Sequence, residues 1–204
     1  VGKCFCSGAD FGWMKQGGEL SIEDNLQDSK NLAKLLESLD ELPQVVVAVV
    51  QGAVMGGGLG LIACCDEVVA HKSTKFRFPE VRLGLLPAII SPYVFSKIPY
   101  SQALALTVSA RIFDADEAKS YGLIHRIYEN ESMEEMMADY VGNAHLASQI
   151  AKDYLKKEFI PKKDSLLMER VIALLSDVRQ NKEAQEGLRA VLEKRTPSWA
   201  EKHL

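Results

Sequence analysis

Apolar residues in the early part of the chain follow two different spacings. Residues 31–42 carry five leucines at helical spacing before Pro43, which predicts an amphipathic helix that ends near the proline. Residues 45–50 are all valine except for one alanine and show no alternation, as expected of a strand buried on both faces. Residues 52–58 are rich in glycine and lead into a small and apolar run, 59–66, which predicts a buried helix. The order strand, glycine loop, helix indicates a βα unit.

The rest of the chain is predicted to change from mixed strands and helices to helices alone. Asp114 is placed to cap a helix, Glu117 completes the capping-box pattern three residues later, and Gly122 is placed to end that helix. The further predicted elements are strands at 67–70 and 75–78 and helices at 101–109, 114–121, 166–180 and 183–194. We therefore predict an α/β core over 1–130 and an appended helical segment over 131–204.

Composition and charge narrow the function classes. The 204 residues are 47% hydrophobic and 25% charged, which is ordinary for a globular protein with one sizeable core. The net charge of -4 argues against nucleic-acid binding, which usually needs a basic face. No apolar run approaches the roughly 20 residues that cross a bilayer, and no secretory leader opens the sequence, so we expect a cytoplasmic or matrix-like protein with no membrane partner. The cysteines and histidines lack the spacing of a disulfide framework or a zinc site, so we expect buried thiols and no metal.

Three consecutive glycines, Gly56, Gly57 and Gly58, stand where a buried strand meets a helix. Glycines let a ligand approach the backbone closely, and the first N–H groups of a helix are free to bind developing negative charge. The same triplet also suits a tight, closely packed turn. Its spacing fits neither the phosphate-binding loop nor the dinucleotide-binding fingerprint, and Ser7 lacks the setting of a hydrolase nucleophile. An oxyanion site and a packed turn remain as the two interpretations.

Several motifs occur in a fixed order along nearly the whole chain. They are FCSGADF at 5–11, QGAVMGGGLGL at 51–61, Cys65-Asp66, FRFPEVRLGLLP at 76–87, FDADEA at 113–118 and Gly122-Leu123-Ile124. In this order and spacing they strongly resemble the crotonase (enoyl-CoA hydratase/isomerase) superfamily. The resemblance implies an α/β fold, a spiral of ββα units with a C-terminal helical segment. Because the chain begins inside what reads as a strand, we expect the N-terminal part of that core to be missing from this sequence.

The resemblance gives individual residues their roles. In this family two backbone N–H groups hold the thioester oxygen, here those of Ala9 and Gly57, and stabilise the enolate that forms during the reaction. Hydratases of the family commonly use two glutamates; one is present as Glu80, and Gly60 stands in place of the other. Apolar neighbours predict a raised pKa for Glu80, which suits acid/base catalysis, whereas a surface glutamate after a turn is the alternative interpretation.

Further residues are expected to contact the acyl-CoA substrate. Trp13 and Met14 would line the acyl pocket, although aromatic and methionine side chains at helical spacing also occur in plain cores. Coenzyme A enters as part of the substrate, so the resemblance implies no separate cofactor. The expected substrate-binding residues are Ser7, Asp10, Trp13, Met14, Gly56, Leu85 and Pro87.

The expected activity is addition of water across the double bond of an enoyl-CoA. The ISPYV motif at 90–94, together with Gly60 and the Trp13-Met14 pair, resembles bacterial methylglutaconyl-CoA hydratases, which act in leucine degradation. The missing glutamate leaves open a Δ3,Δ2-enoyl-CoA isomerase, an acyl-CoA decarboxylase or a catalytically silent homologue, because fold alone does not decide among them. The family's C-terminal helices imply a homotrimer or a dimer of trimers.

Overall fold

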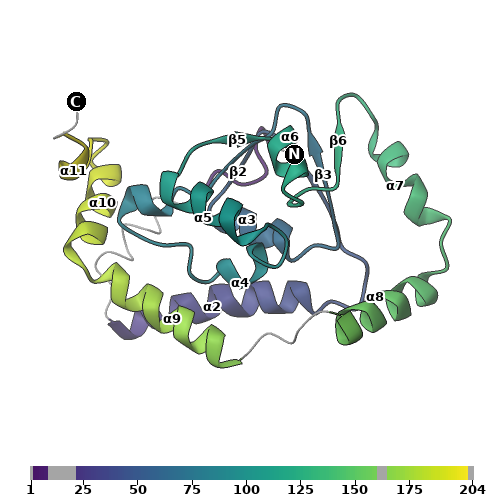
Figure 1. Cartoon of the computed structure of the whole chain (residues 1–204), viewed down its shortest axis with the longest axis horizontal. Helices are drawn as coiled ribbons and strands as arrows, with labels where there is room; N and C mark the ends of the chain where they lie inside the picture. The colour runs from purple at the N-terminus through teal and green to yellow at the C-terminus, as the bar shows by residue number, and fades with distance from the viewer. Residues whose placement is uncertain (1, 9–21, 160–164, 202–204) are drawn as a thin grey trace.

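A computed structural model describes residues 2–8, 22–159 and 165–201 of the chain. Figure 1 shows two small sheets near the centre of the molecule, with helices packed beside them and long helices along the edges. This mixed α/β architecture confirms the predicted fold class.

The first sheet has three parallel strands, in the order β1 (Val47–Val50), β3 (Glu67–His71) and β6 (Arg126–Tyr128). The valine-rich run predicted as a strand is β1, and its register sets Val49 opposite Val69. Buried and half-buried side chains alternate along β1. One face of β1 is therefore covered less completely than the unbroken apolar run predicted.

The second sheet consists of β2 (Ala53–Met55), β4 (Lys75–Arg77) and β5 (Phe113–Asp114). β2 and β4 are parallel, and β5 runs antiparallel to β4. The sequence prediction assigned β2 to a glycine loop, because Gly52 precedes it and the strand is only three residues long. Gly52 has a φ of 70°, a turn conformation that suits glycine, and the strand begins directly after it.

Helices surround these sheets. The amphipathic helix predicted at 31–42 is α2 (Ile22–Asp40), which begins earlier and ends slightly sooner than expected. The buried helix after the glycine triplet is α3 (Gly57–Ala63), which begins within the triplet. The helices that follow in the chain are α4 (Ser91–Val94), α5 (Tyr100–Ser109) and α6 (Ala115–Ser120).

The predicted capping box of α6 is confirmed. The Asp114 side chain accepts a hydrogen bond from the Glu117 N–H at 3.0 Å, and the Glu117 side chain accepts one from the Asp114 N–H. Gly122, with a φ of 83°, ends the helix, and the Leu123 N–H then donates to the Ala118 carbonyl. This pattern is the Schellman motif, in which a left-handed residue satisfies the last carbonyls of a helix.

Helices alone follow β6 among the described residues. They are α7 (Met133–Val141), α8 (His145–Phe159), α9 (Ser165–Arg179), α10 (Lys182–Leu192) and α11 (Ser198–Glu201). α9 packs along α2 at the lower edge in Figure 1, whereas α7 and α8 extend to the right and α10 and α11 lie at the left. None of the helices described is both long and apolar enough to cross a bilayer.

The core beneath the site joins α2, α3 and the second sheet. Leu36 of α2 and Leu59 of α3 are fully buried, as is Phe76 of β4. The Phe76 ring stacks on the Phe113 ring with centroids 5.5 Å apart, and Phe78 stacks on the same ring at 6.2 Å. These aromatic rings give the end of β4 an apolar, closely packed base.

Candidate active site

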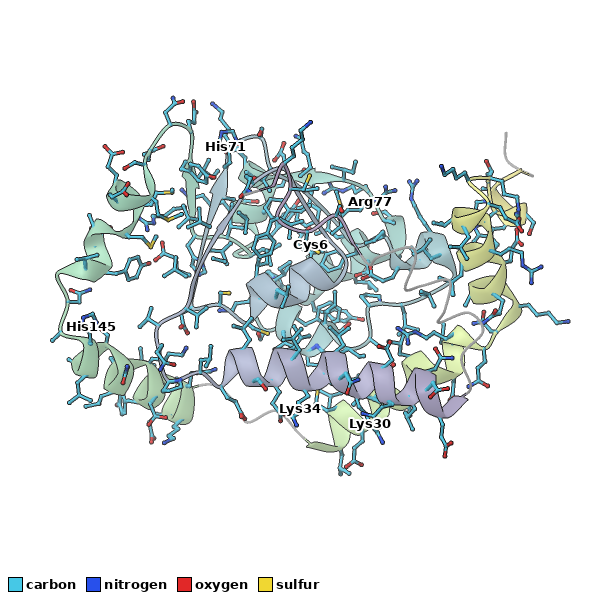
Figure 2. All side chains as sticks on the ribbon, turned by 180° about the vertical axis from the view of Figure 1, so that it is seen from behind. Cys6, Lys30, Lys34, His71, Arg77 and His145 are labelled. Atoms are coloured by element: carbon cyan, nitrogen blue, oxygen red, sulfur yellow. The ribbon has the colours of Figure 1, made fainter. Side chains whose placement is uncertain are left out.

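Two parallel chain segments bring the first two motifs to one edge of the second sheet. Cys6 forms a parallel bridge with Val54; its N–H donates to the Ala53 carbonyl at 3.0 Å, and its carbonyl accepts from the Met55 N–H at 2.9 Å. In Figure 2, Cys6 and Arg77 lie in the middle of the molecule, and the pairings place them on either side of β2. Parallel segments end at the same edge, so the chain reaches Gly8 beside the glycine triplet.

The glycine triplet has the geometry of a site that approaches a ligand closely. Gly56 has a φ of 53° and a ψ of −122°, which disfavours any other residue, and its N–H donates to the Arg77 carbonyl at 3.1 Å. A Cβ added to Gly57 would meet no atom of the described residues within 4 Å, so no described side chain fills the space beside its backbone. Gly57 is the first residue of α3, and the first N–H groups of a helix have no partner inside the helix.

The Glu80 carboxyl group lies against this triplet. Glu80 begins the short 3-10 helix η1 (Glu80–Leu83), which follows β4. Its Oε1 would be 3.3 Å from a Cβ added to Gly56, so a side chain at Gly56 would press on the carboxyl group. Its Oε2 is buried and has no hydrogen-bond partner among the described residues. The structure thus brings Gly56 and Glu80 together, although 23 residues separate them in the chain.

Burial raises the pKa of Glu80 to about 7, and a hydrogen bond from its own backbone N–H opposes part of this rise. A buried carboxylate loses its hydration, which favours the neutral acid. A pKa near 7 means that both protonation states are populated at neutral pH, which is the condition for a group that both takes and gives a proton. The raised pKa agrees with the expectation from the apolar neighbours, and Glu80 is half-buried, whereas a surface glutamate would be exposed.

The position of the family's other glutamate is closed by packing. Gly60 is buried, and a Cβ added there would lie 2.4 Å from Ile90 Cγ2 and 3.3 Å from Leu36 Cδ1. Real Cβ atoms do not approach so closely, so Ile90 fills the space that a glutamate side chain would need. The sequence signalled this contact only through a glycine inside a helical pattern, and it did not identify Ile90 as the facing residue.

The other predicted site residues lie near Glu80 in the chain, beside Gly8 or outside the described residues. Leu85 is half-buried, and its N–H donates to the Glu80 carbonyl at 3.0 Å, which closes the turn behind the carboxyl group. Pro87 is buried, and its carbonyl accepts from the Ser91 hydroxyl at 2.5 Å. Ser7 is exposed beside Gly8, and no hydrogen bond joins it to Glu80 among the described residues. The predicted residues Ala9, Asp10, Trp13 and Met14 lie outside the described part of the chain.

Cysteine and histidine side chains do not form a metal site in the part of the chain that the structure describes. Figure 2 shows His71 and His145 far apart, on different elements. Cys65 is buried, which raises the pKa of its thiol to about 11. The expectation of four buried thiols is wrong for Cys4, which is exposed, and for Cys6, which is half-buried.

Comparisons with known proteins identify the family of the chain. The family described as enoyl-CoA hydratase/isomerase matches residues 1–202. A solved enoyl-CoA hydratase from Shewanella pealeana is 34% identical, with a TM-score of 0.73 over 98% of this chain and 76% of its own. One from Mycobacterium avium is 26% identical, with a TM-score of 0.81 and the same coverage. Mevalonyl-coenzyme A hydratase sidH from Aspergillus fumigatus is 27% identical over 98% of this chain and 75% of that protein. The chain therefore belongs to the enoyl-CoA hydratase/isomerase family, within the crotonase superfamily.

Proposed function

We propose that this protein adds water to an α,β-unsaturated acyl-CoA thioester, with Glu80 as its acid/base group. The observation that carries the proposal is the Glu80 carboxyl group. It is buried and packed against Gly56, and its Oε2 has no hydrogen-bond partner within the described ranges. Enoyl-CoA hydratases among the relatives support the same reaction type.

The proposed reaction uses backbone donors and a single carboxylate. The N–H groups of Gly57 and Ala9 bind the thioester oxygen and stabilise the negative charge that develops there. The Glu80 carboxylate removes a proton from water, and the resulting hydroxide adds to the β-carbon to give an enolate. Protonated Glu80 then returns the proton to the α-carbon, so that the net change is addition of one water molecule. One residue performs both proton transfers because Gly60 supplies no second carboxylate.

We propose a branched acyl group of the methylglutaconyl type as the substrate. The support is the ISPYV motif at 90–94, whose Ile90 packs against Gly60, and the relative named as a mevalonyl-coenzyme A hydratase. Coenzyme A arrives with the substrate, so we expect turnover without any added cofactor. A cytoplasmic location stays a prediction, and cell fractionation would test it.

A substrate panel tests the proposed reaction. Loss of enoyl-thioester absorbance is measured with crotonyl-CoA and 3-methylglutaconyl-CoA for the parent protein, Glu80→Gln and Glu134→Gln. Glu134 is an exposed glutamate of α7 and serves as the matched control. We expect Glu80→Gln to lower kcat by roughly 10²–10⁴-fold and Glu134→Gln to leave it unchanged. No turnover by the parent protein on any short or branched enoyl-CoA would refute the enzymatic role and favour a silent homologue.

An enoyl-CoA isomerase is the second candidate, because the closed position at Gly60 leaves one carboxylate and an isomerase needs only one proton shuttle. A decarboxylase would likewise need no more than one acid/base carboxylate. Turnover in ¹⁸O-labelled water separates the three activities. A hydratase places the label on the β-carbon, an isomerase moves the double bond without taking up label, and a decarboxylase releases carbon dioxide.

We also propose that the protein forms a homotrimer or a dimer of trimers through its C-terminal helices. α8 has no buried residue, and Leu146, Ile150 and Tyr154 form an exposed apolar stripe along it. Light scattering on the parent protein should give a mass of three or six chains. Ile150→Glu should reduce that mass, whereas Ala151→Glu, about 100° around the helix, should not. A monomeric parent protein would contradict the proposal.

A further inference from the structure

The C-terminal helix α10 lies in direct backbone contact with η1, the turn that begins with Glu80. A Cβ added to Gly187 of α10 would lie 2.4 Å from the carbonyl oxygen of Leu83 and 2.9 Å from its Cα. Gly187 is buried, and the atoms that it faces are main-chain atoms that cannot rotate away. Only glycine at this position lets the two backbones approach so closely.

A second contact fixes the other side of the same turn. Gly84, with a φ of 68°, ends η1, and a Cβ added there would lie 2.6 Å from the Ala184 nitrogen. Ala184 belongs to the first turn of α10, and its N–H donates to the side chain of the N-cap residue Asn181 at 2.7 Å. The first turn of α10 is therefore held rigidly where it meets Gly84.

The turn between these contacts and the carboxyl group is short and closed. η1 has four residues, with Glu80 at its start and Leu83 at its end. The Glu80 carbonyl accepts from the Leu85 N–H at 3.0 Å, and the Gly84 N–H donates to the Val81 carbonyl at 3.3 Å. Because these hydrogen bonds close the turn, a displacement of Leu83 or Gly84 also displaces the backbone of Glu80.

From these contacts we infer that α10 positions Glu80, with Gly187 and Gly84 as the positioning residues. The inference rests on the proposed function, because it assigns α10 a role through the acid/base carboxyl group. The elements around the turn carry several charged groups, and the Arg77 guanidinium donates to the Ala110 carbonyl. These groups are Lys182, Glu183, Glu186 and Arg189 on α10, Arg82 on η1, and Lys75 and Arg77 on β4. Burial, and not any of these charges, is the main cause of the raised pKa of Glu80, so we expect a turn that opens to water to lower that pKa.

Gly187→Ala tests this role, with Gly142→Ala as the matched control. Gly142 is the C-cap of another C-terminal helix, α7, and has a negative φ; a Cβ there would meet no described atom within 4 Å. The readout is the midpoint of the pH profile of kcat/KM for hydration, together with a ¹³C titration of labelled glutamate that Glu80→Gln assigns. In Gly187→Ala we expect the turn η1 to shift and water to reach the Glu80 carboxyl group. Because hydration favours the carboxylate, the midpoint of the pH profile should fall from about 7 by roughly half a unit or more.

The outcomes separate the inference from the proposed function. A folded Gly187→Ala protein with a lower melting temperature but an unchanged midpoint and kcat would overturn the positioning role. If Gly187→Ala does not fold, Asn181→Ala loosens the same first turn of α10, and an unchanged midpoint there overturns the inference equally. Parent-like turnover by Glu80→Gln would instead overturn the proposed function itself.

Discussion

The contact between Gly60 and Ile90 makes a prediction about stability that can be worked from the structure. Gly60→Ala places a Cβ 2.4 Å from Ile90 Cγ2, in a core that has no room for it. Overpacking of this kind costs about 1–3 kcal/mol, whereas alanine in place of a helix-interior glycine gains only about 0.5–1 kcal/mol. The two effects oppose each other, and the overpacking is the larger. We therefore expect Gly60→Ala to lower the free energy of unfolding by up to about 2.5 kcal/mol.

A double-mutant cycle isolates the contact. Ile90→Ala alone should cost about 2–5 kcal/mol, because it removes a buried side chain and leaves a cavity. In the double variant the new methyl group of residue 60 enters that cavity, although the Cβ of residue 90 still lies 2.9 Å away and must shift slightly. The double variant should be less destabilised than the sum of the single variants by about 0.5–3 kcal/mol.

Urea unfolding followed by circular dichroism measures all four proteins. Gly142→Ala serves as a control, because a Cβ at that position meets no atom of the described residues within 4 Å and should change stability little. Additive effects of Gly60→Ala and Ile90→Ala, within about 0.3 kcal/mol, would refute the conclusion that Ile90 closes the position of the second glutamate.

Three further predictions concern stability. The pKa of Glu80 is raised on folding from 4.5 to about 7, so the stability that its protonated form contributes is fully present below pH 4.5 and is lost as the pH rises through 7. Between these values the free energy of unfolding should fall by up to ~1.4 kcal/mol per pH unit, and Glu80→Gln should abolish this fall. Asp114→Ala removes the N-cap side chain of α6, so it should lower the free energy of unfolding in urea by about 0.5–2 kcal/mol. A loss below about 0.2 kcal/mol would contradict the capping role. The Lys152 side chain is almost fully buried, and its Nζ lies 2.6 Å from Asp66 Oδ2, so Lys152→Met should lower the free energy of unfolding by about 1–3 kcal/mol. Lys157→Met breaks an exposed ion pair with Asp153 and should lower it by at most about 0.5 kcal/mol. Equal losses in urea or thermal unfolding would contradict the role of burial.

Elements with a strong local signal were predictable from the sequence. The valine run at 45–50 specified β1, and the capping residues Asp114 and Glu117 specified the start of α6. β2 was missed because its three residues lie next to Gly52 and gain their hydrogen bonds from strands distant in the sequence. The early start of α2 was missed because residues 22–30 are mostly polar and one buried serine, Ser29, is satisfied by the carbonyl of its own helix.

Within the described residues, the position of Glu80 and of the glycine triplet was predictable from the sequence, but the contacts around them were not. Motifs indicated Glu80 and the glycine triplet, and apolar neighbours indicated the raised pKa, because these signals are local. The packing of Ile90 on Gly60 and of Gly187 on Leu83 joins segments that lie far apart in the chain. A glycine in a helical pattern signals that something approaches closely, but only the fold identifies the neighbour.

The pH dependence of kcat/KM for hydration tests the central claim that a buried Glu80 carboxylate is the single acid/base group. We predict that kcat/KM rises with pH with a midpoint near 7, because the deprotonated carboxylate must accept a proton from water. Glu80→Gln should lose turnover, and the residual activity should not show this rise. A midpoint near 4.5, or parent-like turnover by Glu80→Gln, would contradict the central claim.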